Sequence, residues 1–169
     1  MMNEILRRSH REIAIFSSER YVFNTSADIS PRIRGFHSAL KDAGFRHLNG
    51  RTFYSMPDSL SDARECIMTI RKKYPKTSLI CTDSDHSAEL LDSVMRTMEI
   101  PLSEKIAITG FGNVSRLPIA SVDQNPERQG RLAVQQILDF HRNPDRSFPS
   151  MVEPVETFLV RADYIPTRM

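Results

Sequence analysis

The sequence predicts an α/β protein in which a parallel sheet is flanked by helices. Short apolar segments with strand character alternate with helical segments of ~10–15 residues, which is typical of right-handed β-α-β units. Gly110 and Gly112 flank the end of one such strand, and Asn125-Pro126 begins a helix soon afterwards. Glycines at a strand end let the backbone approach a small ligand closely. We therefore expect a binding crevice at the strand ends.

The first part of the chain predicts a helix, a strand and a second helix. Residues 3–9 form a short helix with a weak start signal, and the compact apolar segment 12–17 is a strand. A polar loop over 18–29 precedes Ser30, which caps a helix that has Pro31 in its first turn. The apolar positions of this helix follow helical spacing up to a stop at Gly44: Ile33, Phe36, Ala39 and Leu40.

The middle of the chain repeats the alternation. We expect strands at 51–56, 78–82 and 105–109, separated by helices over 59–73 and 84–98. Each of these helices carries its apolar residues on one face, and a proline follows each one within a few residues. The order strand, helix, strand, helix, strand is the reason for predicting a parallel sheet.

The last part of the chain is expected to complete the sheet and then leave it. The Gly-Phe-Gly segment at 110–112 predicts a turn, after which a short strand covers 119–123. An amphipathic helix follows over 126–141. The alternating tail 155–164 is typical of a final strand.

Composition and charge exclude several classes of protein. The chain has 169 residues, enough for one sizeable core or two small lobes, and its net charge of +2 does not demand nucleic acid or an anionic membrane as a partner. Cys66 and Cys81 fall in apolar patterns and suit a reducing compartment. The sequence holds no CxxC or HExxH motif, no apolar run near the ~18 residues of a membrane span and no signal peptide. We expect a cytoplasmic protein with no metal, no cofactor and no membrane contact.

A catalytic interpretation finds little support. Asp83, Asp85 and His86 follow a strand, where α/β enzymes place acids and bases. Ser84 or Asp83 also serves there as a cap and dipole partner for the next helix, and we favour that interpretation. No GxSxG, Walker A or GxGxxG motif occurs, and nothing assembles a nucleophile, a base and an orienting group. We therefore expect no enzyme activity.

Binding of a small polar molecule fits the pattern better. Arg32 lies in the first turn of the helix after the first strand, where its guanidinium can bridge sugar hydroxyls or a carboxylate, although a surface arginine is an equally simple explanation. Further polar residues lie just after strands or in the first turns of helices. A parallel sheet brings such residues to one edge, where neutral hydroxylated ligands can bind. The candidate ligand-binding residues are Asp28, Ser30, Arg32, Ser84, Asp85, Gly112, Asn113 and Gln124.

Six segments resemble, in order and nearly in spacing, the C-terminal part of the effector-binding domain of LacI/GalR-family bacterial transcription regulators. Arg32 lies three residues before Gly35, as in the family's R-x-x-G-F helix, and Ser84-Asp85 stand where the family has Asn-Asp. Each motif is weak alone, but all of them in order over nearly the whole chain are specific. The segments are SHREIAIF (9–16), SPRIRGFHSAL (30–40), ICTDSDHSAELL (80–91), IPLSEKIAITGFGN (100–113), SVDQNPERQGRLAVQQIL (121–138) and FLVRADY (158–164).

The resemblance implies a periplasmic-binding-protein-like fold with two α/β lobes and a small molecule, often a sugar, in the cleft between them. Residues from about 10 to 125 would form the C-terminal lobe, and 126–169 would partly return to the other lobe, which is largely missing. The family dimerises through this domain and reads operator DNA with an N-terminal helix-turn-helix that is absent from this chain. The effector would face Arg32, Asp28, Ser84 and Gln124.

The chain departs from the family pattern at the expected site. Gly112 stands where the family has an aspartate whose carboxylate usually binds sugar hydroxyls, and Ser84 stands where the family has an asparagine. The segment between Gly112 and Ser121 is several residues shorter than is usual in the family. We expect the effector-sensing and dimerisation part of a regulator, with a sugar or a sugar derivative as ligand. The alternatives are a stand-alone sugar-binding protein of the periplasmic type and a truncated remnant that only dimerises.

Overall fold

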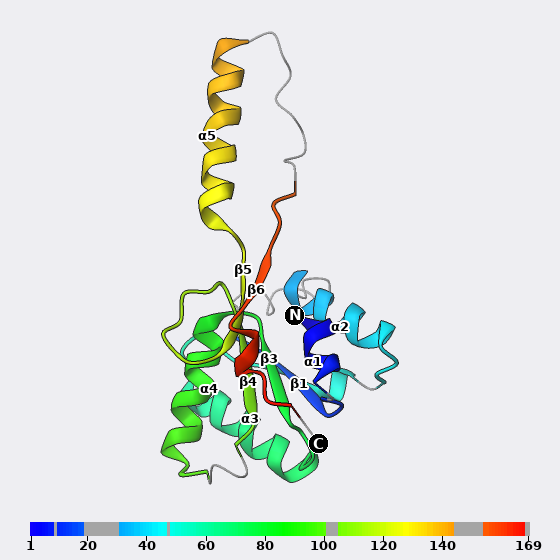
Figure 1. Cartoon of the computed structure of the whole chain (residues 1–169). Coiled ribbons are helices and arrows are strands. Elements are labelled where there is room, and N and C mark those ends of the chain that lie inside the picture. Colours follow the sequence, from blue (N-terminus) through cyan, green and yellow to red (C-terminus); the bar gives the residue numbers. More distant parts are fainter. Residues whose placement is uncertain (9, 19–30, 47, 101–104, 144–153, 168–169) are drawn as a thin grey trace.

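A computed structural model describes residues 1–8, 10–18, 31–46, 48–100, 105–143 and 154–167 of the chain. The described strands form one sheet in the order β2-β1-β3-β4-β5-β6 (Figure 1). The strands are β1 (Ile13–Ser17), β2 (Thr52–Tyr54), β3 (Leu79–Thr82), β4 (Ala107–Phe111), β5 (Ala120–Asp123) and β6 (Phe158–Val160). The helices are α1 (Met2–Arg7), α2 (Pro31–Asp42), α3 (Leu60–Lys73), α4 (Asp85–Thr97) and α5 (Pro126–Arg142), with short 3₁₀ helices η2 (Leu48–Arg51) and η4 (Ala162–Tyr164).

The sheet is parallel from β2 to β5, as predicted, and its last pair is antiparallel. Strand β6 pairs with β5 in the opposite direction, with Val122 facing Leu159. Helices connect β1 to β2, β2 to β3 and β3 to β4, and each crossing returns the chain to the same edge of the sheet, whereas a loop alone joins β4 to the parallel strand β5. Helix α5 instead leads away from the sheet, and the chain comes back beside β5 (Figure 1). The returning strand therefore runs the other way.

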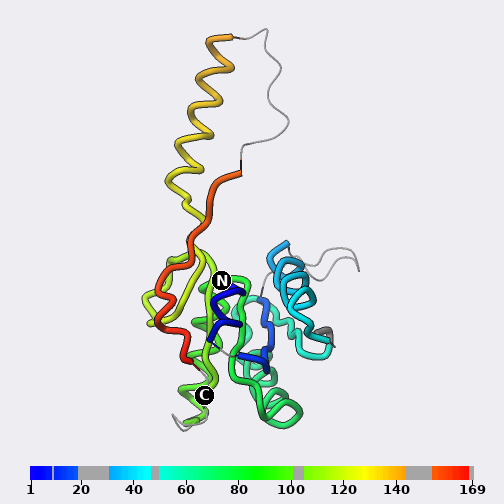
Figure 2. The backbone as a smooth tube through the Cα atoms, turned by 45° about the vertical axis from the view of Figure 1, so that its right-hand side comes forward, coloured from blue at the N-terminus to red at the C-terminus, as the bar shows by residue number. Residues whose placement is uncertain are grey.

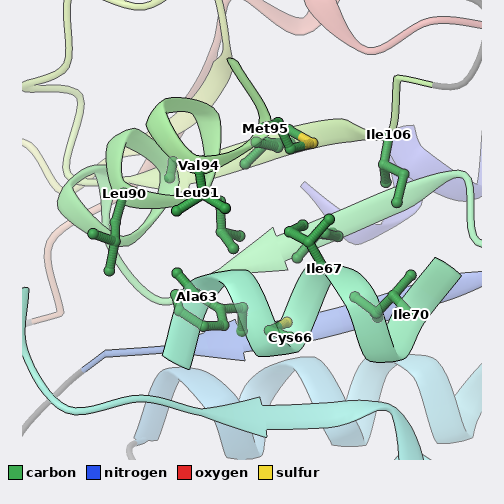
Figure 3. Close-up of a cluster of buried hydrophobic side chains, with 14 of the residues drawn as sticks. Ala63, Cys66, Ile67, Ile70, Leu90, Leu91, Val94, Met95 and Ile106 are labelled. Carbon is green, nitrogen blue, oxygen red and sulfur yellow. The ribbon is translucent and has the colours of Figure 1, made fainter. Parts of the chain in front are cut away.

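Helices cover both faces of the sheet, and the strands alternate their side chains between two cores. Along β1, Ala14 and Phe16 face the core formed with α3 and α4, whereas Ile13 and Ile15 face the core formed with α1 and α2. Figure 3 shows Ile67 of α3 and other side chains of this helix directed toward α4 in the first core. This three-layer arrangement confirms the α/β prediction.

Two helix starts agree with the caps read from the sequence, because the Ser84 hydroxyl accepts from the Ser87 amide at 3.1 Å and the Asn125 side chain from the Arg128 amide at 3.4 Å. The Ser59 hydroxyl caps α3 in the same way, accepting from the Asp62 amide at 3.2 Å. Helix α2 begins at Pro31 as expected, and the chain turns at Gly44, whose φ is +84°. Ser30, its predicted cap, lies outside the described residues.

The strand that precedes the predicted glycine turn is longer than expected. We predicted a strand over 105–109 and a turn at 110–112, but Gly110 and Phe111 belong to β4 and pair with Ser121 and Val122 of β5. Only Gly112 turns, with φ at +124° and its amide bonded to the Val122 carbonyl at 2.8 Å. Pairing with β5 therefore extends β4 through residues whose local sequence favours a turn.

Helix α5 projects from the body of the molecule. Figures 1 and 2 show it extending away from the sheet. It forms over nearly the predicted residues and has an apolar face, yet none of its residues is buried. The exposed apolar side chains on it are Val134, Ile137, Leu138 and Phe140.

Candidate functional site

The carboxyl ends of β1, β3, β4 and β5 lie along one edge of the sheet, here called the strand-end rim. Because these strands are parallel and adjacent, the residues that follow them come together there. The rim consists of Ser17, Ser18, Asp83, Ser84, Phe111, Gly112, Asn113, Asp123 and Gln124, with Arg32 from the start of α2. Polar residues from separate segments of the sequence therefore share one edge of the sheet.

Arg32 is held over the rim by contacts with three different strand ends. Its Nη1 donates to the Asp83 carbonyl oxygen at 2.9 Å and its Nη2 to Gln124 Oε1 at 3.4 Å. The guanidinium carbon also lies 4.6 Å from the centre of the Phe111 ring, a cation–π distance. The side chain is half-buried, so its planar fork is oriented and still borders solvent.

Asp85 anchors the loop after β4. It is 1% exposed, and its carboxylate accepts from the Val114 and Ser115 amides at 2.6 and 2.9 Å and from the Ser121 hydroxyl at 2.6 Å. Three donors use most of the acceptor capacity of one carboxylate. Asp85, one of the candidate ligand-binding residues, therefore holds the loop after β4 and does not point toward solvent.

Asn113 lies at the outer end of this loop and is exposed. Its Nδ2 donates to Asp123 Oδ2 at 2.9 Å, and its Oδ1 accepts from Arg161 Nη2 at 3.0 Å. Arg161 also donates to the carbonyls of Ser115 and Leu117 at 3.2 and 3.5 Å. The Asp85 carboxylate and the Arg161 guanidinium thus both hold the loop between β4 and β5 in place.

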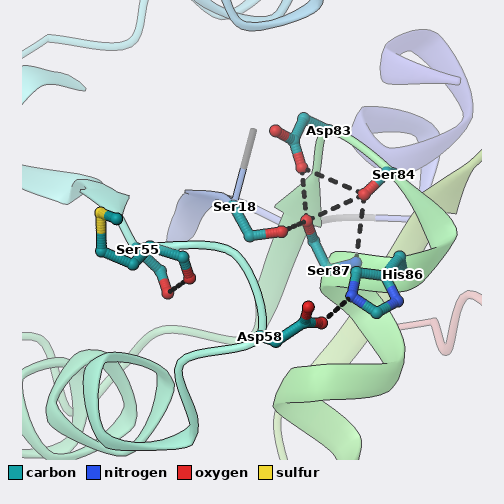
Figure 4. Close-up of polar contacts among 8 residues, drawn as sticks. Ser18, Ser55, Asp58, Asp83, Ser84, His86 and Ser87 are labelled. Atoms are coloured by element: carbon teal, nitrogen blue, oxygen red, sulfur yellow. Dashed lines mark hydrogen bonds and ion pairs between the residues drawn. The ribbon is translucent and has the colours of Figure 1, made fainter. Parts of the chain in front are cut away.

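The carboxylate of Asp83, one of the two candidates for capping α4, is buried and is surrounded by serine hydroxyls instead. Asp83 is 0% exposed and accepts from the Ser17 hydroxyl and, at 2.6 Å, from the Ser87 hydroxyl. Ser84, not Asp83, caps α4. Figure 4 shows the Ser18, Ser84 and Ser87 hydroxyls gathered beside the Asp83 carboxylate.

Two of the predicted site residues cannot be placed. Asp28 and Ser30 lie outside the described residues. Arg32 and Gln124 meet, and Ser84, Gly112 and Asn113 lie on the same rim. The contacts of Asp83 and Arg161 could not be predicted, because their partners lie 66 and 48 residues away in the sequence and leave no local signal.

A groove of about 520 Å³ lies at the opposite edge of the sheet, between the end of α4, the start of β4 and η4. Three of its charged side chains pair with one another, because Asp92 contacts Arg96 at 2.6 Å and Lys105 at 3.5 Å. The groove is separate from the strand-end rim. Within the described part of the chain, no three His, Cys, Asp or Glu side chains gather as a metal site requires.

The fold is an α/β sheet with polar residues along its strand-end rim, and comparison with known proteins gives its family. The chain belongs to the family of periplasmic binding protein-like domains, whose model matches residues 2–162. Comparison with curated protein sequences gave no significant match. Among the described helices, none has the length and apolarity needed to cross a bilayer.

Solved structures of LacI-family regulators share the fold. The chain resembles a transcriptional regulator CelR in complex with cellobiose (TM-score 0.70, 19% identity), covering 94% of this chain and 48% of that one. It also resembles a LacI-family regulator from Silicibacter pomeroyi (0.69, 21%, covering 98% and 50%). A third is a sugar-binding LacI-family regulator from Escherichia coli complexed with phosphate (0.72, 16%, covering 99% and 60%). The family match and this shared fold confirm the resemblance drawn from the motifs.

Proposed function

We propose that the chain is the effector-sensing part of a LacI-type bacterial transcription regulator and that its ligand is a sugar or a sugar derivative. The observation that carries the proposal is the position of Arg32. Its half-buried guanidinium is oriented by Asp83, Gln124 and Phe111 at the edge of the sheet where α/β proteins bind ligands. A rigid fork of N–H donors in such a place suits hydroxyl oxygens.

The remaining rim residues give the ligand further partners. Ser84 and Gln124 offer neutral hydrogen-bonding groups beside Arg32, and Asn113 and the Gly112 backbone close the β4 side. Asp28 and Ser30 immediately precede α2 in the chain and belong to the same proposed site. Asp85 supports it by fixing the loop that carries Gly112 and Asn113.

We assign residues from about 10 to 125 to one lobe and part of 126–169 to a second lobe that this chain largely lacks. Two observations support this division. Helix α5 has an apolar face but no buried residue and projects beyond the sheet. The chain also spans only 48–60% of the length of the solved regulators it resembles. Effector bound between the lobes would favour one arrangement of them.

The proposed assembly follows from the same resemblance. The complete regulator would be a cytoplasmic homodimer that contacts operator DNA through a helix-turn-helix outside this chain. The net charge of +2 gives this chain no strong electrostatic footprint for DNA. Its contribution would be binding rather than catalysis, in agreement with the regulators among the solved structures.

The proposal can be tested with a thermal-shift screen of the 169-residue chain against sugars, sugar phosphates, nucleosides and purines. A ligand present at a hundred times its dissociation constant adds about 2.7 kcal/mol to the free energy of unfolding. For a domain of this size, that corresponds to roughly 5–11 °C if each kcal/mol moves Tm by about 2–4 °C. A concentration-dependent shift with a sugar supports the proposal. A cooperative melt that no sugar moves overturns it for this chain.

A further inference from the structure

The serine hydroxyls beside Asp83 have a fixed hydrogen-bond direction. Ser17, at the end of β1, donates to Asp83 Oδ2, and Ser87, in the first turn of α4, donates to Asp83 Oδ1 at 2.6 Å. A carboxylate can only accept, and hydrogen bonds to an ionised acceptor are about twice as strong as those between neutral groups. Each of these two serines therefore directs its one hydroxyl proton to the Asp83 carboxylate.

The direction of the Ser87 hydrogen bond fixes the directions of the hydrogen bonds that Ser18 and Ser84 make. Ser18 Oγ lies 2.6 Å and Ser84 Oγ 2.9 Å from Ser87 Oγ. Because the Ser87 proton is already directed to Asp83, Ser18 must donate its own proton to Ser87, and Ser84 must donate to Ser87 or to Asp83 Oδ1 at 3.5 Å. All four hydroxyl protons then point inward.

From this we infer that Asp83 makes the Ser18–Ser84 corner of the rim a pure hydrogen-bond acceptor, so that it selects ligands that present a hydroxyl or amino donor there. This inference rests on the proposed function, because it concerns the ligand of the same rim. Ser84 is the half-buried member through which a ligand reaches the corner, and its oxygen keeps one lone pair beyond the bond from the Ser87 amide.

The corner differs in polarity from the neighbouring Arg32, which is donor only. A neutral polyol satisfies both, because each of its hydroxyls can donate to Ser84 or accept from Arg32. A fluorine or a fully ionised phosphate placed against Ser84 has no proton to give. Such a group would leave acceptor facing acceptor in a partly desolvated place. Asp83 is thus a positioning residue that acts on the ligand through the serines.

The proton directions can be tested without a ligand by neutron diffraction from a deuterated crystal of the whole chain. The expected deuterons lie on Ser87 Oγ toward Asp83 Oδ1 and on Ser18 Oγ toward Ser87 Oγ. A Ser18 deuteron directed away from Ser87, or a deuteron on the Asp83 carboxyl, overturns the inference whatever the chain binds.

The consequence for selectivity can be measured with hexoses and their monodeoxyfluoro analogues by calorimetric titration. For the hydroxyl that faces Ser84, we expect fluorine to weaken binding to the wild-type chain about tenfold or more. Asp83→Ala removes the acceptor on which the Ser84 and Ser87 protons both depend, so a hydroxyl can donate outward and the fluorine penalty at that position should fall to about threefold or less. Ser87→Ala frees the Ser18 proton alone, because Ser84 can still donate to Asp83 Oδ1.

Matched controls separate polarity from folding. Ser115→Ala removes another buried serine hydroxyl, one that donates to Glu89, and should leave the fluorine penalty unchanged. If Asp83→Ala does not fold, the isosteric Asp83→Asn, whose amide donates as well as accepts, tests the same proton directions. A penalty that is equal in the wild type and the folded Asp83 variant overturns the inference while leaving sugar binding intact. Failure of every hexose to bind the wild-type chain instead overturns the proposed function, and the selectivity with it.

Discussion

The carboxylate of Asp85 occupies the space into which a side chain at Gly110 would project. A Cβ atom built on Gly110 would overlap Asp85 Oδ1 and lie 3.1 Å from both Asp85 Cγ and the Ile119 Cδ1 methyl carbon. Three donors from the β4–β5 loop and β5 hold that carboxylate in place. Gly110 is therefore required for space, and its missing side chain lets the first turn of α4 anchor the loop of the rim.

Substitution of Gly110 by alanine should destabilise the chain by about 1–3 kcal/mol, the usual range for overpacking a buried site. The measurement is urea denaturation followed by circular dichroism. Gly35→Ala is the matched control, because it lies in α2 with nothing within 4 Å of an added Cβ. Alanine in a helix interior should stabilise the chain by about 0.5–1 kcal/mol. Equal effects of the two substitutions would contradict the packing described for Asp85.

Arg32 should matter for ligand binding and little for folding. For Arg32→Ala, we expect loss of the sugar-induced thermal shift with the melting temperature of the unliganded chain nearly unchanged. Arg32→Lys keeps the charge but loses the planar fork and should recover only part of the shift. Arg34→Ala, two residues further along α2 and exposed, is the control that should bind as the wild type does. A full shift in Arg32→Ala would remove Arg32 from the site.

Local signals were sufficient for most elements of the fold. Helix α3 begins after the Ser59 cap and ends at Lys73, before Tyr74-Pro75, because capping and the proline act within a few residues. The same holds for the starts of α4 and α5 at Ser84 and Asn125. Strand ends depended on pairing instead. The extension of β4 through Phe111 requires β5 as its partner, which no window around residue 111 contains.

The site could be predicted only in outline. The rule that parallel strands end at one edge placed Arg32 and Gln124 together, although they are 92 residues apart in the sequence. It could not show which polar side chains turn inward. Asp83 faces Ser17, 66 residues earlier, and Asp85 faces the β4–β5 loop, although only Ser84 separates them in the chain. Those orientations depend on the tertiary contacts of each carboxylate.

The projecting helix predicts that apolar residues on α5 add little to the stability of this chain. Ile137 is 59% exposed, so Ile137→Ala should change the free energy of unfolding by no more than about 0.5 kcal/mol. Ile67 of α3 is 0% exposed, and Ile67→Ala should cost about 2–5 kcal/mol. Both can be measured by urea denaturation at low protein concentration. A loss above about 1 kcal/mol for Ile137→Ala would mean that α5 packs against the body or against a second chain.

The two cysteines should be unreactive in the folded chain and should make it less stable in alkali. Both are buried, and burial raises the pKa of the Cys81 thiol to about 12 and that of Cys66 well above its ordinary value. Alkylation by iodoacetamide at pH 8 should therefore be slow until denaturant is added.

The dependence of stability on pH follows from the same shift. Above about pH 9, an unfolded chain releases the thiol protons while the folded chain keeps them, so the folded state binds more protons. The free energy of unfolding should then fall as pH rises from about 9 toward the pKa of the folded thiols. The Cys66→Ala, Cys81→Ala double variant is less stable at neutral pH because it loses buried volume, but its curve should fall less steeply over that range. Parallel curves for the wild type and the variant, or rapid alkylation of the native chain, would show that the thiols are open to solvent.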